Sequence, residues 1–194
     1  MHGHQCERRL FDVAARASLR GVRVLHAVRA LRTWKYWPWL RDLGLVLLLV
    51  AAFRLYQHRN LASGPAPTLV ASDVEGVDRS LASYRGAPLL LHFWATWCGT
   101  CRMEQPNIDA LAGDLPVLSV ASRSGSAQRV AAYARANAVV PSVIADPDGS
   151  LARRFGVGAF PTSFVLDEQG RIRHAEVGYS TELGLRVRMW LAHF

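Results

Sequence analysis

The stretch Leu89–Pro106 reads LLLHFWATWCGTCRMEQP, and it decides the fold. Residues 89–94 form an apolar run with the length and composition of a central parallel strand that is covered on both faces. A Trp-Cys-Gly-Thr-Cys turn follows, and the residues after it predict a helix from Gly99 to about Asp114 that bends or restarts near Pro106. Two cysteines therefore lie where a strand passes into a helix.

The placement of Cys98 and Cys101 indicates a redox pair rather than a packing feature. Cys98 is predicted at the helix N-terminus, where free N–H groups and the positive end of the helix dipole stabilise a thiolate. Cys101 lies one turn further along, close enough to form a short disulfide with its neighbour. The sequence therefore predicts a dithiol that exchanges electrons with other dithiols.

The formal net charge of +8 belongs entirely to the N-terminal segment. Residues 1–59 hold 11 Lys and Arg against 3 Asp and Glu, whereas residues 60–194 hold 12 against 12. Because the basic residues precede an apolar segment, orientation at a membrane explains them, and we expect no binding of nucleic acid. Residues 1–39 are interpreted as a basic cytoplasmic leader, either an amphipathic helix on an anionic membrane surface or a poorly ordered extension.

The apolar stretch from Leu43 to Phe53 contains no charged residue. It is shorter than the roughly 20 residues that span a bilayer, but apolar neighbours lengthen it, and Arg41 and Arg54 can reach toward the headgroups. We predict an uncleaved transmembrane signal anchor at residues 40–58, in preference to a cleaved signal peptide or a buried helix. The positive charge upstream then places the N-terminus in the cytoplasm and the catalytic domain in the periplasm, on a single-pass protein of the inner (cytoplasmic) membrane.

Residues 59–67 are rich in small residues and proline and are expected to be a linker, so the folded domain is predicted at residues 68–194. Strands alternate with helices through most of this domain, which ends with a hairpin and a helix. This order predicts an α/β fold with a mixed central sheet and helices on both faces, preceded by the N-terminal membrane anchor. Besides the strand at 89–94 and the helix after it, the expected elements are hairpins of 68–72 with 77–80 and of 162–166 with 172–177, a turn or short helix at 81–85, strands at 117–121 and 142–145, and helices at 126–137, 151–155 and 181–193.

The active-site stretch resembles that of the thioredoxin superfamily. Residues 93–101, FWATWCGTC, match its motif, and the continuation RMEQP is similar to the membrane-anchored extracytoplasmic branch of the TlpA, ResA and CcmG type. Residues 156–162, GVGAFPT, resemble the second landmark of the superfamily, a loop whose cis-proline faces the disulfide. The C-terminal VGYSTELGLRVRMWLA is most similar to ScsD-type protein disulfide oxidoreductases, which are linked to suppression of copper sensitivity.

This resemblance implies a thioredoxin-like fold and a role for each residue of the motif. Cys98 attacks a partner disulfide as a thiolate, and Cys101 resolves the mixed disulfide, so the pair alternates between a dithiol and the Cys98–Cys101 disulfide. A cis bond before Pro161 leaves the backbone near Phe160 free to pair with an incoming peptide. The residues expected to meet that substrate are Trp97, Gly99, Thr100 and Phe160, of which Gly99 and Thr100 also influence the reduction potential.

Two further polar residues belong to the predicted catalytic set. His92 occupies the strand position where thioredoxin has a buried aspartate that handles the proton of the second cysteine. A histidine could relay that proton because its pKa is ordinarily near neutral, or it could be a hydrogen-bonded core residue. Glu104 matches a glutamate near the ResA-type active site, where partial burial beside a dithiol would raise its pKa. The alternative for Glu104 is an ordinary exposed residue of the first helical turn.

The sequence predicts a membrane-tethered protein disulfide oxidoreductase that reduces client disulfides, in a setting of copper or oxidative stress tolerance. Its expected partners are client proteins with disulfides and a membrane electron donor of the DsbD or ScsB type, and the reverse direction, oxidation of clients, stays open. We expect a monomer with no cofactor and no metal. The first alternative is a cytochrome c maturation reductase of the CcmG or ResA type, although the proline loop reads AFPTSF and lacks an acidic residue after the proline. A Cu(I)-binding module and a peroxidase are weaker alternatives, because the Trp-Cys-Gly-Thr-Cys turn argues against both.

Overall fold

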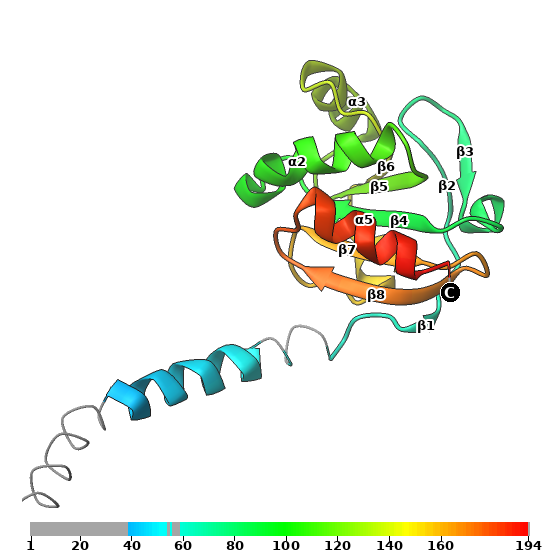
Figure 1. Cartoon of the computed structure of the whole chain (residues 1–194). Helices are drawn as coiled ribbons and strands as arrows, with labels where there is room; N and C mark the ends of the chain where they lie inside the picture. The colour runs from blue at the N-terminus through cyan, green and yellow to red at the C-terminus, as the bar shows by residue number, and fades with distance from the viewer. Residues whose placement is uncertain (1–38, 54, 56–58, 194) are drawn as a thin grey trace, which may run out of the picture. The chain divides into compact units, whose positions relative to one another are not determined.

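The computed structural model describes residues 39–53, 55 and 59–193 (Figure 1). The chain divides into two compact units, Met1–Phe53 and Arg54–Phe194. In the first unit, residues 39–53 form a helix whose large apolar side chains, such as Leu47 and Leu48, are exposed. No helix in the described part of the chain is both long and apolar enough to cross a membrane. The predicted leader lies almost wholly outside the described residues, and so does part of the predicted anchor.

The second unit is built around a mixed sheet, as the sequence predicts. Six strands lie in the order β1-β8-β7-β4-β5-β6, and β2 pairs with β3 in a separate hairpin. β4, β5 and β6 are parallel to one another, whereas β7, β8 and β1 pair antiparallel. The elements are β1 (Gly64–Pro65), β2 (Val70–Ser72), β3 (Asp78–Ser80), η1 (Leu81–Tyr84), β4 (Leu89–Trp94), α2 (Gly99–Ala112), β5 (Val117–Ser122), α3 (Ala127–Ala136), β6 (Ser142–Asp146), α4 (Ser150–Arg154), β7 (Thr162–Leu166), β8 (Arg171–Val177) and α5 (Glu182–Leu191).

β4 is the central strand, and all six of its residues are buried, as its apolar run predicts. Its side chains alternate between the two faces of the sheet. On one face Phe93 packs in a cluster with Phe155, which follows α4. On the other face Leu90 packs with Ile108 of α2 and Leu185 of α5. Helices therefore cover both faces, and Figure 1 shows α5 (red) beside β7, against which it packs.

A row of polar side chains divides the packing on the face covered by α2, α3 and α5. Leu90 belongs to an apolar cluster with α5, the α5 cluster, and Trp94 to a second one around Cys98 and Cys101, the disulfide cluster. His92 lies between these two residues on β4, on the same face. The strand register places Ser163 of β7 and Ser119 of β5 beside His92. This polar row, Ser163–His92–Ser119, crosses three strands between the two clusters.

The segment expected to be a linker packs against the domain from Asn60 onward. The Ala62 N–H donates to the Phe155 carbonyl at 3.0 Å, and β1 adds an edge strand to β8. Gly156 lies beneath this segment with a φ of 71°, and a Cβ at that position would collide with the Asn60 carbonyl. Residues 60–66, the N-terminal strap, therefore belong to the folded unit, which extends beyond its predicted start.

The other predicted elements are present with ends shifted by one or two residues. The prediction at Pro106 was a bend or a restart, and the restart is wrong: α2 continues through Pro106 as a single helix. A proline inside a helix costs about 3 kcal/mol. The buried face of α2, which includes Cys101, Ile108 and Leu111, offsets that cost because it packs on the sheet along the whole helix.

Candidate active site

Cys98 and Cys101 form a disulfide at the N-terminus of α2, with their Cα atoms 5.3 Å apart. Cys98 is the N-cap residue of the helix, and its Sγ accepts a hydrogen bond from the Cys101 N–H at 3.1 Å. Both residues are largely buried, with Cys98 7% exposed and Cys101 2% exposed. Cys98 is thus the more exposed residue of the pair, as expected for an attacking cysteine.

The loop that carries Pro161 lies against this disulfide. The Phe160–Pro161 peptide bond is cis, as predicted, and the Phe160 carbonyl oxygen is 3.7 Å from Cys98 Sγ. Trp97 is 62% exposed, and its ring meets the ring of Phe160 edge-on at a centroid distance of 5.9 Å. Trp97 Nε1 also donates to the Arg123 carbonyl at 3.0 Å. Trp97 is therefore an exposed aromatic side chain fixed beside the dithiol by contacts on two sides.

Gly99 and Thr100 form the first turn of α2 between the two sulfurs. Gly99 is exposed and Thr100 is half-buried. A Cβ built on Gly99 would meet no atom within 4 Å. The space beside Gly99 is therefore open.

Glu104 is fully buried one turn beyond Cys101, on the same face of α2. Its Oε1 accepts a hydrogen bond from the Ser180 N–H at 2.9 Å, and its Oε2 has no partner in the described part of the chain. Burial raises the pKa of Glu104 to about 7, although the Ser180 N–H partly offsets this effect. The carboxyl can therefore gain or lose a proton near neutral pH, and the alternative of an exposed helix residue does not hold.

His92 lies in the polar row, with Nδ1 2.9 Å from Ser163 Oγ. Its Nε2 has no hydrogen-bond partner among the described residues. Burial lowers the pKa of His92 to about 3, so the imidazole is neutral at physiological pH. The near-neutral pKa on which the predicted proton relay depends is therefore absent, and Glu104 has the pKa that suits proton exchange with the dithiol.

Several residues of the site were not predicted. Ser163 lies two residues after Pro161, so the alternation of a strand after the proline could have placed it on the His92 face. Ser180 and Arg123 come from loops whose approach to the site has no local sequence signal. Trp94 of β4 is buried against Tyr133. Within the described ranges, no three His, Cys, Asp or Glu side chains gather where they could hold a metal ion.

Comparison with known proteins identifies the family. The sequence profile of the AhpC/TSA family matches residues 62–175, which is more than half of the chain. The chain belongs to the AhpC/TSA family. A thioredoxin-like protein of Haemophilus influenzae is 32% identical to this AhpC/TSA member over 155 residues, covering 79% of this chain and 92% of that protein. The thiol:disulfide interchange protein DsbE of Pseudomonas fluorescens biotype C is 31% identical over 157 residues, covering 75% of this chain and 88% of that protein.

Further relatives agree with this placement. The thiol-disulfide oxidoreductase ResA of Geobacillus thermodenitrificans is 28% identical over 151 residues, covering 71% of this chain and 86% of that protein. Among solved structures, a thioredoxin-family thiol:disulfide interchange protein of Chlorobium tepidum TLS matches with a TM-score of 0.58 at 26% identity, covering 68% of this chain and 97% of that one. This AhpC/TSA member thus has a thioredoxin-like fold and is a thiol–disulfide oxidoreductase whose redox pair is Cys98–Cys101.

Proposed function

We propose that this oxidoreductase is tethered to the inner membrane and reduces disulfides of client proteins in the periplasm, as a monomer. One observation supports disulfide exchange through this pair. Cys98 is the more exposed of the two cysteines, and a buried carboxyl with a pKa of about 7 lies one turn beyond Cys101, at Glu104. The pair thus has one residue nearer to a client and one residue near a group that can take up a proton.

The reaction begins from the reduced dithiol. The Cys98 thiolate attacks one sulfur of a client disulfide, the client S–S bond breaks, and its other sulfur leaves as a thiolate that takes a proton. Cys101 then loses its proton and attacks Cys98 Sγ, which breaks the mixed disulfide and releases the second client thiol. Two electrons have moved to the client, and the protein is left with the Cys98–Cys101 disulfide seen in the structure.

Glu104 and the proline loop have separate tasks in this scheme. The deprotonated Glu104 accepts the proton that Cys101 must lose, because its pKa allows both states near neutral pH. Phe160 presents its backbone beside Cys98, next to the exposed ring of Trp97, where an extended client segment can pair with it. The neutral His92 has no proton-transfer task in this scheme, and its Nδ1 lies 2.9 Å from Ser163 Oγ within the polar row.

Tethering is supported by the first unit. The helix at 39–53 leaves its large apolar side chains exposed to the surroundings, which is costly in water and favourable in lipid. The positive charge of residues 1–59 favours an orientation with the N-terminus in the cytoplasm. A periplasmic reductase needs electrons from across the membrane, so we propose a DsbD- or ScsB-type donor.

The redox state of Cys98 and Cys101 in growing cells tests the direction of electron flow. Cells are quenched with acid, and free thiols are labelled with a reagent that adds mass. A mostly reduced pair in an oxidising compartment indicates that a membrane donor keeps it charged. A mostly oxidised pair, in cells whose donor is intact, would overturn the reductase assignment.

Two settings for the reaction can be distinguished genetically. The chain is 28% identical to a thiol-disulfide oxidoreductase ResA, in line with the first alternative from the sequence, a cytochrome c maturation reductase of the CcmG or ResA type. The C-terminal resemblance to ScsD-type proteins instead favours tolerance of copper or oxidative stress. Deletion of the gene should lower holocytochrome c in the first case and copper tolerance in the second. We favour the second because Thr162 and Ser163 follow Pro161 where the first alternative expects an acidic residue.

A further inference from the structure

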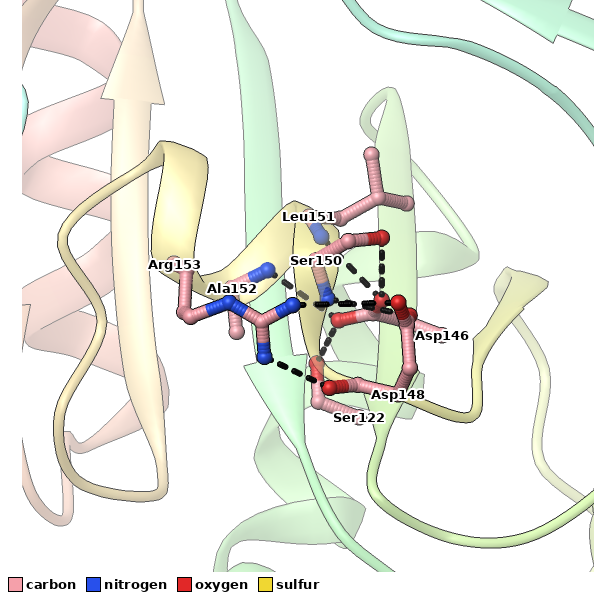
Figure 2. A network of polar contacts seen from close by, with 7 residues as sticks. All are labelled: Ser122, Asp146, Asp148, Ser150, Leu151, Ala152 and Arg153. Carbon is pink, nitrogen blue, oxygen red and sulfur yellow. Dashed lines mark hydrogen bonds and ion pairs between the residues drawn. The ribbon is translucent and has the colours of Figure 1, made fainter.

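Asp146, the last residue of β6, is a buried carboxylate that is 2% exposed. Figure 2 shows it at the centre of a polar network between the end of β5 and the start of α4. The carboxylate accepts four hydrogen bonds, from Ser122 Oγ (2.8 Å), Ser150 Oγ (3.4 Å), the Leu151 N–H (3.1 Å) and the Ala152 N–H (3.0 Å). Burial of a carboxylate is costly unless several donors replace water, and this one has them.

The backbone of Asp146 also holds the segment that follows β5. The Arg123 N–H donates to the Asp146 carbonyl at 2.8 Å, while Ser122 binds the carboxylate. Arg123 has a φ of 50°, in the left-handed region that residues other than glycine seldom adopt. A non-glycine residue stays in such a conformation when its surroundings fix it. Asp146 therefore fixes residues 122–124 through its side chain and its main chain together.

The other side of the same segment holds the two residues before Cys98. The Arg123 carbonyl accepts the hydrogen bond from Trp97 Nε1 at 3.0 Å. Ser124 Oγ accepts a hydrogen bond from the Thr96 N–H at 3.0 Å and donates to the Ser122 carbonyl at 3.0 Å. Residues 122–124 thus form a bridge with Asp146 on one side and the approach to the dithiol on the other.

We propose that Asp146 is a positioning residue for client binding. Through residues 122–124 it fixes the exposed Trp97 beside Cys98, so that a client meets a preformed surface and does not have to order it. This inference rests on the proposed function, since it concerns the binding of a disulfide-bearing protein segment. Its contacts with Cys98 are indirect, so its loss should weaken client binding more than it slows thiol exchange.

The test is Asp146→Asn in the full chain. The amide keeps the size of the side chain but offers one acceptor oxygen and places an NH₂ group among donors. Reduced protein is mixed with increasing concentrations of a peptide that contains an intramolecular disulfide, and single-turnover rates are recorded. The half-saturating peptide concentration should rise about fivefold, as the loss of roughly one hydrogen bond implies, with a limiting rate within twofold of wild type.

A spectroscopic readout follows Trp97 directly. The protein is labelled with fluorotryptophan, and the ¹⁹F resonance of Trp97 is assigned from its absence in Trp97→Phe. Asp146→Asn should shift or broaden that resonance and leave the one of Trp94 unchanged, because Trp94 is held by Ser119 and Tyr133. An unchanged Trp97 resonance together with an unchanged half-saturating concentration would overturn the proposal.

Asp167→Asn is the matched control. Asp167 is equally buried, accepts hydrogen bonds from the N–H groups of Gln169 and Arg171 where β7 turns into β8, and pairs with Arg173 at 2.9 Å, but none of these bonds reaches residues 122–124. It should lower stability without changing the Trp97 resonance or the half-saturating concentration. Equal effects of the two substitutions would mean that Asp146 is only structural.

A second variant covers the case in which Asp146→Asn does not fold, and a further outcome distinguishes failure of this inference from failure of the proposed function. If Asp146→Asn does not fold, Ser122→Ala removes one of the four bonds to the carboxylate and should raise the half-saturating concentration about threefold with a shift of the Trp97 resonance. No such shift in Ser122→Ala would contradict the proposal. If wild-type protein fails to reduce any peptide disulfide, the proposed function fails, while the Trp97 resonance still reports whether Asp146 positions that side chain.

Discussion

Cys98 and Cys101 differ in exposure, and this difference gives them different roles. Cys101→Ser leaves the attacking sulfur without its resolving partner, so a mixed disulfide between Cys98 and a client should accumulate. It should appear as a higher-mass band on non-reducing gels that dithiothreitol removes. Cys98→Ser, in which the less exposed sulfur remains, should give little or no adduct. Equal trapping by both variants would contradict the assignment of Cys98 as the attacking residue.

Glu104 makes stability depend on pH in a direction that follows from its raised pKa. The folded carboxyl has a pKa of about 7 against 4.5 in the unfolded chain, so between these values the folded state binds more protons. Burial of Glu104 therefore costs almost no stability below pH 4.5, where the carboxyl is protonated in both states. As pH rises the cost grows, and above pH 7 it lowers the free energy of unfolding by about 3 kcal/mol. Glu104→Gln should remove this loss. Denaturant unfolding should show a stability gain over wild type that is much larger at pH 8 than at pH 5.

His92 also makes the free energy of unfolding depend on pH, and this effect must be distinguished from that of Glu104. The lowered pKa of His92 means that the unfolded chain gains a proton as pH falls below 6.5, which destabilises the fold toward acidic pH. Both proteins keep His92, so its effect cancels in the difference between wild type and Glu104→Gln. The exposed Glu75→Gln serves as a control and should follow wild type at both pH values.

At the scale of elements, the N-terminal strap and the loop beneath it make contact at Gly156. Gly156→Ala should lower the free energy of unfolding by about 2 kcal/mol, from the positive φ and from displacement of the Asn60 carbonyl. Gly158→Ala, two residues further in the same loop, should be nearly neutral because nothing lies within 4 Å of its added Cβ. Thermal or denaturant unfolding of the two variants checks the difference.

A double-mutant cycle separates the two causes. In a chain that begins at residue 68 the strap is absent, so Gly156→Ala should cost only the part due to φ, about 1 kcal/mol. The same cost in chains that begin at residue 59 and at residue 68 would show that the strap does not rest on Gly156. The shorter chain should itself be less stable, since it loses β1 and the apolar contacts of Leu61, Ala62 and Ala66.

The elements that sequence reasoning located are those with a strong local pattern. β4 is a continuous apolar run, and the turn before α2 has a fixed motif, so both were placed to the residue at their starts. β1 was missed because Gly64–Pro65 has no strand propensity and pairs only where the folded edge of β8 offers partners. A restart at Pro106 was one of the two predicted possibilities, because local rules do not include the packing of the rest of α2.

The candidate site also contains some residues that the sequence could predict and others that only the folded structure reveals. The cysteines could be found from their spacing, and Glu104 and Pro161 from the resemblance to the thioredoxin superfamily. The pKa of His92 could not, since its value follows from complete burial without a charged partner. Asp146 could not be placed near the site either, because the link from β6 through residues 122–124 to Trp97 exists only in the folded domain.

At the scale of the whole molecule, the proposed tether makes a prediction about fractionation. The full chain should remain in the membrane fraction after alkaline extraction, whereas a chain that begins at residue 59 should be soluble and retain disulfide exchange. External protease should degrade the domain in spheroplasts and leave a cytosolic marker intact. Release of the full chain by alkali, or protection of the domain, would exclude an anchored periplasmic protein.

The polar row bears on how the domain opens. On the α2 face of the sheet, Ser163, His92 and Ser119 separate the α5 cluster from the disulfide cluster, so apolar packing is interrupted between the two. Cooperative opening follows continuous packing, so the two ends can loosen as separate units. Amide hydrogen exchange after reduction should accelerate at Cys101 and Ala121 before it changes at Leu185. The protein can then relax around its sulfurs, as thiol exchange requires, while the far end keeps the chain folded.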